Sequence, residues 1–129
     1  MTEKGHFIIV FIASFAIFIT ATSSRLHGST IATLDIINSL PNATVVSCKP
    51  SLVSQKSLGP GEDVKVEVTE KSLIYCQAVW GLRYFASWHA YQPARDKNSV
   101  TVFWDMKENG IFLSWDKTHW VKKAVWETD

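Results

Sequence analysis

The C-terminal half of this 129-residue chain holds side chains that could carry out acid–base catalysis. A histidine beside a carboxylate can move protons near neutral pH, and the candidates are His89, His119, Asp96, Asp105, Glu108 and Asp116. His89 lies within an aromatic segment and His119 follows an expected turn, so we interpret both as structural. No serine stands in a nucleophile elbow. We therefore predict no catalytic residue and no enzyme, with a small hydrolase or nuclease as an alternative that depends on the two histidines.

The sequence also lacks the spacings that hold metals and phosphates. It contains no His-Glu-x-x-His, no Cys-x-x-Cys pair and no phosphate-binding glycine loop, and two lone histidines make no metal-ligand set. We predict no metal and no cofactor. The net charge of +1 is far from the basic excess of nucleic-acid-binding proteins. We therefore expect no nucleic-acid partner.

Residues 1–24 have the three-part layout of a secretory signal peptide. A basic residue precedes an apolar run at 7–19, and the small residues Ala21, Ser23 and Ser24 after it suit a cleavage site. At 1.5 Å per residue the run reaches about 20 Å, against about 30 Å for the hydrocarbon core of a bilayer. We predict cleavage after Ser23 or Ser24, secretion to the extracellular space and no stable membrane insertion afterwards. The alternative is an uncleaved anchor or a buried helix.

Export bears on two features of the mature chain. An oxidising compartment allows Cys48 and Cys76 to form a disulfide. It also opens the glycosylation sequon that starts at Asn42. The neighbouring Pro41 indicates an exposed turn that can accommodate a glycan. We predict a glycoprotein modified at Asn42.

The mature chain, residues 25–129, is interpreted as one all-β domain. Its clearest strand alternates Val64, Val66 and Val68 with polar residues. Runs of β-branched and aromatic residues predict further strands at 30–38, 44–48, 72–80, 83–91, 99–106, 111–115 and 119–126. Residues 49–62 and 92–98 are expected to be polar loops. Seven to eight short strands without an amphipathic helix predict a small antiparallel β-sandwich, with a barrel as the alternative.

The six tryptophans are expected to fill the core between two sheets, because large rings suit a thin interior. They are Trp80, Trp88, Trp104, Trp115, Trp120 and Trp126. Of these, Trp115 and Trp120 are expected to be the most exposed. The alternative is an exposed platform on which a ligand stacks.

Several short motifs follow one another in a consistent order along the mature chain. They are Asn38-x-Leu40, Cys48, Leu58-Gly59, Leu73-Ile74-Tyr75-Cys76-Gln77-Ala78-Val79-Trp80, His89-x-Tyr91, Arg95-Asp96, Trp104 and Gly110-Ile111-Phe112. In this order they resemble the plant self-incompatibility S-protein homologue family, over most of the mature chain. The resemblance implies a small secreted β-sandwich that acts as an extracellular ligand for a cell-surface receptor and is not an enzyme.

The chain departs from the family pattern in its cysteines. Family members usually carry four, and the later two are missing here between Arg95-Asp96 and Trp104. The strand at Val64 is also rich in valine where the family is often aromatic, so we treat the chain as a divergent member. Loss of one cysteine pair together implies that Cys48 and Cys76 bond to each other. Two buried free thiols are the alternative.

We expect binding to occur through loops that are held in place by a rigid sandwich. The long segment 49–62 is one candidate, and the loop 92–98 is the other, with Arg95, Asp96 and Lys97 as the binding residues. A solvated loop without a partner is the alternative. We expect the protein to be a monomer and its partner to be a receptor or other extracellular protein. A secreted glycan or cell-wall binding module that uses exposed aromatic rings is the second functional hypothesis.

Overall fold

The computed structural model describes residues 29–50 and 53–128. The expected signal peptide, residues 1–24, lies outside the described residues, so its cleavage stays a prediction. Within the described part of the chain, no helix is long and apolar enough to cross a membrane.

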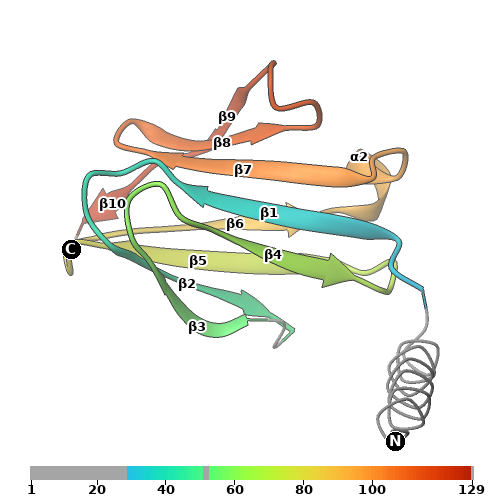
Figure 1. Cartoon of the computed structure of the whole chain (residues 1–129), viewed down its shortest axis with the longest axis horizontal. Coiled ribbons are helices and arrows are strands. Elements are labelled where there is room, and N and C mark those ends of the chain that lie inside the picture. The colour runs from blue at the N-terminus through green and yellow to red at the C-terminus, as the bar shows by residue number, and fades with distance from the viewer. Residues whose placement is uncertain (1–28, 51–52, 129) are drawn as a thin grey trace, which may run out of the picture.

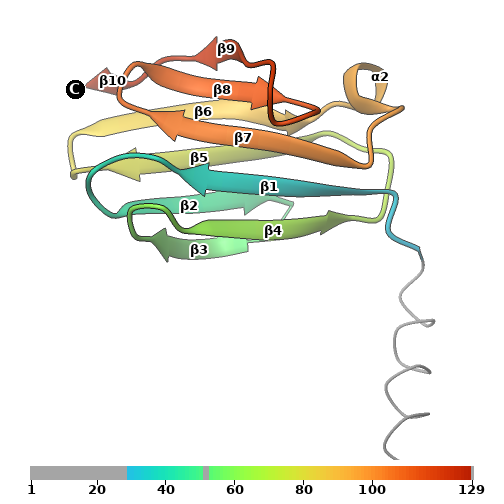
Figure 2. The same ribbon diagram turned by 45° about the horizontal axis from the view of Figure 1, so that its top comes forward.

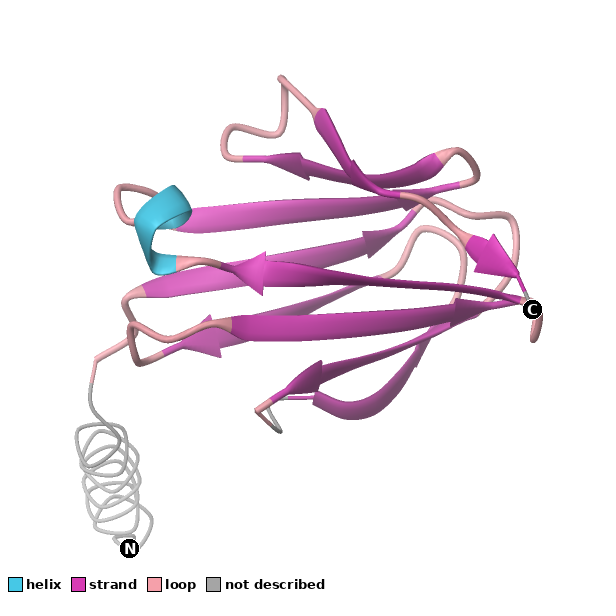
Figure 3. Cartoon of the chain, turned by 180° about the vertical axis from the view of Figure 1, so that it is seen from behind, coloured by secondary structure: helices cyan, strands magenta, loops and turns pink. Residues whose placement is uncertain are grey.

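Two five-stranded sheets pack face to face, which confirms the all-β sandwich (Figures 1 and 2). Sheet I has the order β4 (Asp63–Val68), β1 (Ala32–Asn38), β7 (Thr101–Lys107), β8 (Gly110–Ser114) and β9 (Val121–Ala124). Sheet II has the order β10 (Glu127–Thr128), β6 (Tyr84–Tyr91), β5 (Ile74–Trp80), β2 (Thr44–Lys49) and β3 (Val53–Leu58). A short helix, α2 (Pro93–Asp96), joins β6 to β7 at the end of the sandwich opposite the C-terminus (Figure 3).

The strands form because apolar residues alternate with polar ones at the period of an extended chain. In β4 the valines at 64, 66 and 68 face the other sheet, while Asp63, Lys65 and Glu67 face outward. In β5 and β6 the inward positions carry small or buried residues such as Cys76, Ala78 and Trp88. One face of each sheet is therefore dry and the other is open to solvent.

The core lies between the sheets. Its largest fully buried side chains include Trp104, Leu34, Ile36, Met106, Ile111 and Leu113 from sheet I and Val46 and Leu58 from sheet II. The rings of Trp88 and Trp104 meet across the interface, with centroids 5.8 Å apart. These contacts join the two layers.

The expectation of a six-tryptophan core is wrong for most of its members. Only Trp88 and Trp104 are buried in it. Trp80 and Trp126 are half-buried and pack against its rim, with ring centroids 5.5 Å apart. Trp115 is exposed, as expected, and Trp120 is half-buried. The rest of the thin interior is filled by aliphatic side chains around these two rings.

Three details of the strand prediction were wrong. Residues 49–62 are not a loop throughout, because they contain β3, whose exposed polar residues hide its periodicity at a sheet edge. The last predicted strand, 119–126, ends early because the chain crosses from sheet I to sheet II between β9 and β10. The sheets therefore hold ten strands rather than seven to eight. The sandwich is also not purely antiparallel, since β1 and β7 pair in parallel.

The disulfide between Cys48 and Cys76 is confirmed. The two residues stand directly opposite each other on β2 and β5, with a Cα–Cα distance of 4.0 Å. Both side chains are buried on the inner face of sheet II. Asn42 is exposed in the turn between β1 and β2, and its glycosylation stays a prediction.

Candidate binding surface

The carboxylate of Asp96 is the centre of the corner where the chain passes from sheet II to sheet I. It is fully buried and accepts hydrogen bonds from Arg95 Nε at 2.8 Å and Arg95 Nη2 at 2.7 Å. The Gln92 amide donates to it at 2.9 Å, and Trp115 Nε1 at 2.8 Å. Burial raises the pKa of Asp96, but these hydrogen bonds outweigh burial and hold its pKa below the ordinary value. The carboxylate is therefore charged and fully occupied.

Arg95 completes the same corner. Its Nη2 also donates to the carbonyl oxygens of His89 at 3.1 Å and Ala90 at 3.2 Å. The guanidinium lies 5.3 Å from the ring centroid of Trp104, whose Nε1 donates to Ala90 O at 2.9 Å. The expected binding loop is therefore in part a structural clamp. Asp96 has no exposed surface with which to touch a partner, whereas Lys97 is exposed and stays a candidate contact.

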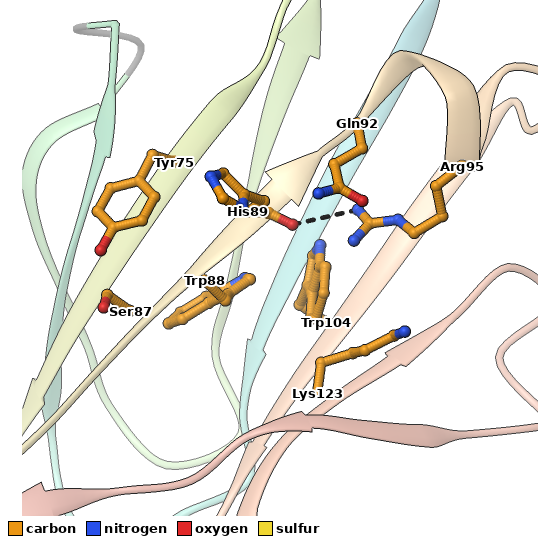
Figure 4. Close-up of a pocket in the computed structure, with 8 residues that line it drawn as sticks. All are labelled: Tyr75, Ser87, Trp88, His89, Gln92, Arg95, Trp104 and Lys123. Atoms are coloured by element: carbon orange, nitrogen blue, oxygen red, sulfur yellow. Dashed lines mark hydrogen bonds between the residues drawn. The ribbon is translucent and has the colours of Figure 1, made fainter.

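A hollow of about 330 Å³ lies beside this clamp (Figure 4). It is lined by Tyr75, Ser87, Trp88, His89, Gln92, Arg95, Trp104 and Lys123. These residues come from both sheets and from α2, and β10 pairs only with the first two residues of β6. The hollow therefore borders a part of β6 that β10 leaves uncovered.

Val45 and Ser47 of β2 and the outward side chains of β5 and β6 form a surface that we call the neutral face. Its positions on β5 and β6 are Tyr75, Gln77, Val79, Phe85, Ser87 and His89, with no Asp, Glu, Lys or Arg. Val45, Val79 and Phe85 are direct cross-strand neighbours. They are 38%, 41% and 42% exposed. A solvent-exposed row of apolar side chains thus crosses β2, β5 and β6.

The outer face of sheet I carries a charged cluster instead. Lys65 Nζ lies 2.8 Å from Asp63 Oδ2 and 3.6 Å from Asp35 Oδ2. Burial raises the pKa of Asp35 to about 6, and the hydrogen bond and negative charge of Asp63 add to this effect. The hydrogen bond from Asp35 correspondingly lowers the pKa of Asp63. The two carboxyl groups thus share a site in which Asp35 takes up a proton first.

The residues considered for catalysis are dispersed. His119 Nδ1 lies 2.7 Å from Asp116 Oδ2 in an exposed turn, where the backbone and ring of His119 hold the pKa of Asp116 well below its usual range. His89 points outward beside Tyr75, with ring centroids 5.4 Å apart. Asp105 is buried and accepts a hydrogen bond from a serine hydroxyl. Among the described residues, no group of three or more His, Cys, Asp or Glu could hold a metal ion.

Comparison with solved structures finds a match for this architecture. The matching structure is of SPH (self-incompatibility protein homologue) proteins, described as a widespread family of small, highly stable, secreted proteins from plants. It aligns with a TM-score of 0.63 and 14% identity over 79% of this chain and 99% of the other. The chain has the SPH fold. This confirms, at the level of the fold, the resemblance that the sequence motifs indicated.

No family model matches the chain, and no curated protein matches its sequence. The Arg95-Asp96 motif of the resemblance has a structural role in this SPH fold. Arg95 bonds to β6 of sheet II, and Asp96 bonds to Trp115, which follows β8 of sheet I. Sequence reasoning named Arg95 for its charge but missed Gln92 and Lys123. A single sequence gives no indication that α2 and β9 lie at the same hollow.

Proposed function

We propose that the protein is a secreted, non-enzymatic recognition protein that binds a cell-surface receptor through the neutral face. The SPH fold is found in small secreted plant proteins, and the signal-like segment at residues 1–24 and the Cys48–Cys76 disulfide suit the same compartment. A rigid disulfide-linked sandwich offers a partner a preformed surface, which limits the entropy lost on binding.

The neutral face is the observation that carries this proposal. Exposed strand positions on soluble proteins commonly hold polar or charged residues. Here the adjacent positions Val45, Val79 and Phe85 are apolar, and Tyr75 extends the surface along β5. Aromatic residues and an absence of charge are typical of the centre of a protein interface. The exposed Lys49 stands opposite Tyr75 at the edge of this surface, and the exposed Lys97 follows α2, so both could orient the encounter.

The test introduces a charge at the middle of the face. Val79→Glu is compared with Val121→Glu on β9 of sheet I, which has the same residue type and similar exposure, 48% against 41%. Labelled protein is titrated onto intact cells of the organism that makes it, with saturable binding as the measurement. Val79→Glu should weaken binding about tenfold or more, because a buried interfacial charge without a partner is strongly unfavourable.

Val121→Glu should leave binding within about twofold of the wild type. Equal binding by all three proteins, each checked to have the same melting temperature, would remove the neutral face from the recognition surface. Equal loss in both variants would show that general surface charge governs the interaction.

A further inference from the structure

We propose that the hollow beside α2 binds a carboxylate-bearing sugar, such as one uronic acid unit of an acidic oligosaccharide. This ligand is distinct from the receptor proposed above. Its site shares Tyr75, Ser87 and His89 with the edge of the neutral face but includes none of the apolar row Val45, Val79 and Phe85.

The charges around the hollow favour an anion. Arg95 and Lys123 supply the cationic groups, and none of the lining residues is an aspartate or glutamate. The nearby Asp96 is fully buried behind Arg95 and already accepts four hydrogen bonds. The nitrogens Nε and Nη2 of Arg95 are used by the clamp, while Nη1 makes no hydrogen bond within the described chain. An arginine held in place with a spare donor is suited to a carboxylate.

The neutral polar groups favour a sugar over an acidic peptide. Tyr75, Ser87 and Gln92 contribute two hydroxyl groups and an amide to the lining, and Figure 4 shows the Tyr75 and Ser87 hydroxyls apart from the cationic groups. A sugar acid presents several hydroxyls next to its carboxylate, so it can satisfy both sets. An aspartate or glutamate side chain would engage the cations and leave the other groups unpaired.

The indole of Trp88 provides an independent observation. Its ring lines the hollow, and the residue is only 5% exposed. Its Nε1 is buried and has no hydrogen-bond partner among the described residues. Buried donors without partners are rare in folded proteins and call for an explanation. Because Nε1 itself has almost no accessible surface, a ligand oxygen in the hollow accepts this hydrogen bond only after the neighbouring side chains move.

The size of the hollow agrees with a single ring. Its volume of about 330 Å³ lies at the lower end of the range for small-molecule sites. One sugar unit fits such a volume, while its neighbours in a chain would run outside along the uncovered part of β6. The aromatic ring of Tyr75, 38% exposed, offers an apolar surface to the C–H face of that unit.

The experiment is a calorimetric titration of the secreted protein with three probes of equal length. These are an oligomer of galacturonic acid, an oligomer of neutral galactose and a peptide of glutamates. The galacturonate oligomer should bind, with an affinity that falls as salt is raised, and the other two should bind at least tenfold more weakly. Binding of the neutral oligomer at equal strength, or of none of the probes, would overturn the proposal. Equal binding of the glutamate peptide would assign the hollow to an acidic protein partner instead.

The variants are chosen at the rim, because Arg95 also holds the fold together. Lys123→Gln and Gln92→Ala should each weaken galacturonate binding about fivefold. Lys122→Gln is the matched control, since Lys122 precedes Lys123 on β9 and its side chain lies over Gly110 rather than at the hollow. An equal effect of the two lysine variants would reduce the interaction to non-specific charge. Val79→Glu should leave this titration unchanged, so failure here and failure of the receptor proposal are distinguishable.

Discussion

The two outer faces of the sandwich differ in how far their aromatic side chains are exposed to solvent. On sheet I, Lys117 Nζ lies 5.5 Å from the ring centroid of Phe103, and Lys107 Nζ lies 5.5 Å from that of Phe112. Both phenylalanines are half-buried beneath these cations. On sheet II, Phe85 stands 42% exposed without a lysine above it. The same fold thus covers its aromatic residues on one face and leaves them accessible on the other.

This difference indicates that the neutral face does not result from a shortage of polar residues. The chain has 13 Lys and Arg and 12 Asp and Glu, enough to cover both surfaces. A charged face stays hydrated and resists association, whereas an apolar row releases water when a partner covers it. If the two faces are independent, a change on one face should leave the properties of the other unchanged.

The largest expected effect comes from breaking the corner that links the two sheets. Asp96→Ala should lower the free energy of unfolding by about 3–5 kcal/mol, because it leaves the largely buried Arg95 without its partner. Urea unfolding monitored by tryptophan fluorescence measures this change. Lys97→Ala, the exposed neighbour, should stay within about 0.5 kcal/mol of the wild type. Equal stability of the two variants would show that the clamp does not connect the sheets energetically.

The disulfide belongs to the sheet that carries the neutral face. Replacing both cysteines, Cys48→Ala with Cys76→Ala, opens a loop with a sequence separation of 28 residues. The chain-entropy relation gives a loss of about 3.6 kcal/mol in the free energy of unfolding. The wild type unfolded in the presence of a thiol reductant should lose the same amount. A loss below about 1 kcal/mol in both experiments would mean that pairing of β2 with β5 already restrains this sheet.

The sequence predicted the sandwich because it follows from local signals, whereas the disulfide partners followed from the expected export of a chain with two cysteines and from the family resemblance. Period-two alternation locates β4, and β-branched runs locate β1 and β2. It missed β3 because an edge strand with one neighbour can keep polar residues on most of its positions. It also missed the parallel pairing of β1 with β7, which joins segments more than 60 residues apart. Pairing at that distance leaves no local trace.

The binding surfaces were harder to predict for a related reason. The aromatic segments of β5 and β6 were recognised, but their outward positions become one surface only when β2, β5 and β6 lie side by side. Arg95 and Asp96 were predicted as binding residues from their charge, and they also form one motif of the resemblance. Their spacing does not reveal that they pair with each other, since adjacent residues of opposite charge are equally common on open loops.

A smaller effect, dependent on pH, should be confined to the charged face. Because the folded state raises the pKa of Asp35 from 3.8 to about 6, it keeps a proton that the unfolded chain has lost at the same pH. The stabilisation from this proton is present below about pH 4 and is lost as the pH rises through 6. Asp35→Asn, which resembles the protonated form, should therefore gain stability relative to the wild type between pH 4 and 7, by at most about 3 kcal/mol.

Urea unfolding of both proteins at several pH values measures this trend. The lowered pKa of Asp63 acts in the opposite direction, so the wild-type curve alone does not isolate Asp35. In Asp63→Asn the neighbouring negative charge is absent, and the pH dependence due to Asp35 should shrink. A stability difference between Asp35→Asn and the wild type that is constant over this range would show that Asp35 is already ionised at pH 4.

The smallest expected effect concerns the turn between β5 and β6, next to the neutral face. Leu82 is 96% exposed and adopts a left-handed backbone with φ of 62°, which disfavours leucine and tolerates asparagine. Leu82→Asn should raise the free energy of unfolding by about 0.5–1 kcal/mol.

On the charged face the residue in the same conformation is Lys117, with φ of 65°. Lys117→Asn should raise the free energy of unfolding by less, because it also loses the contact with Phe103. If Leu82→Asn stabilises the protein but weakens cell binding, the exposed leucine serves the partner at the expense of the fold. Unchanged cell binding would instead show that Leu82 lies outside the recognition surface, which then extends only to Val79 and Phe85.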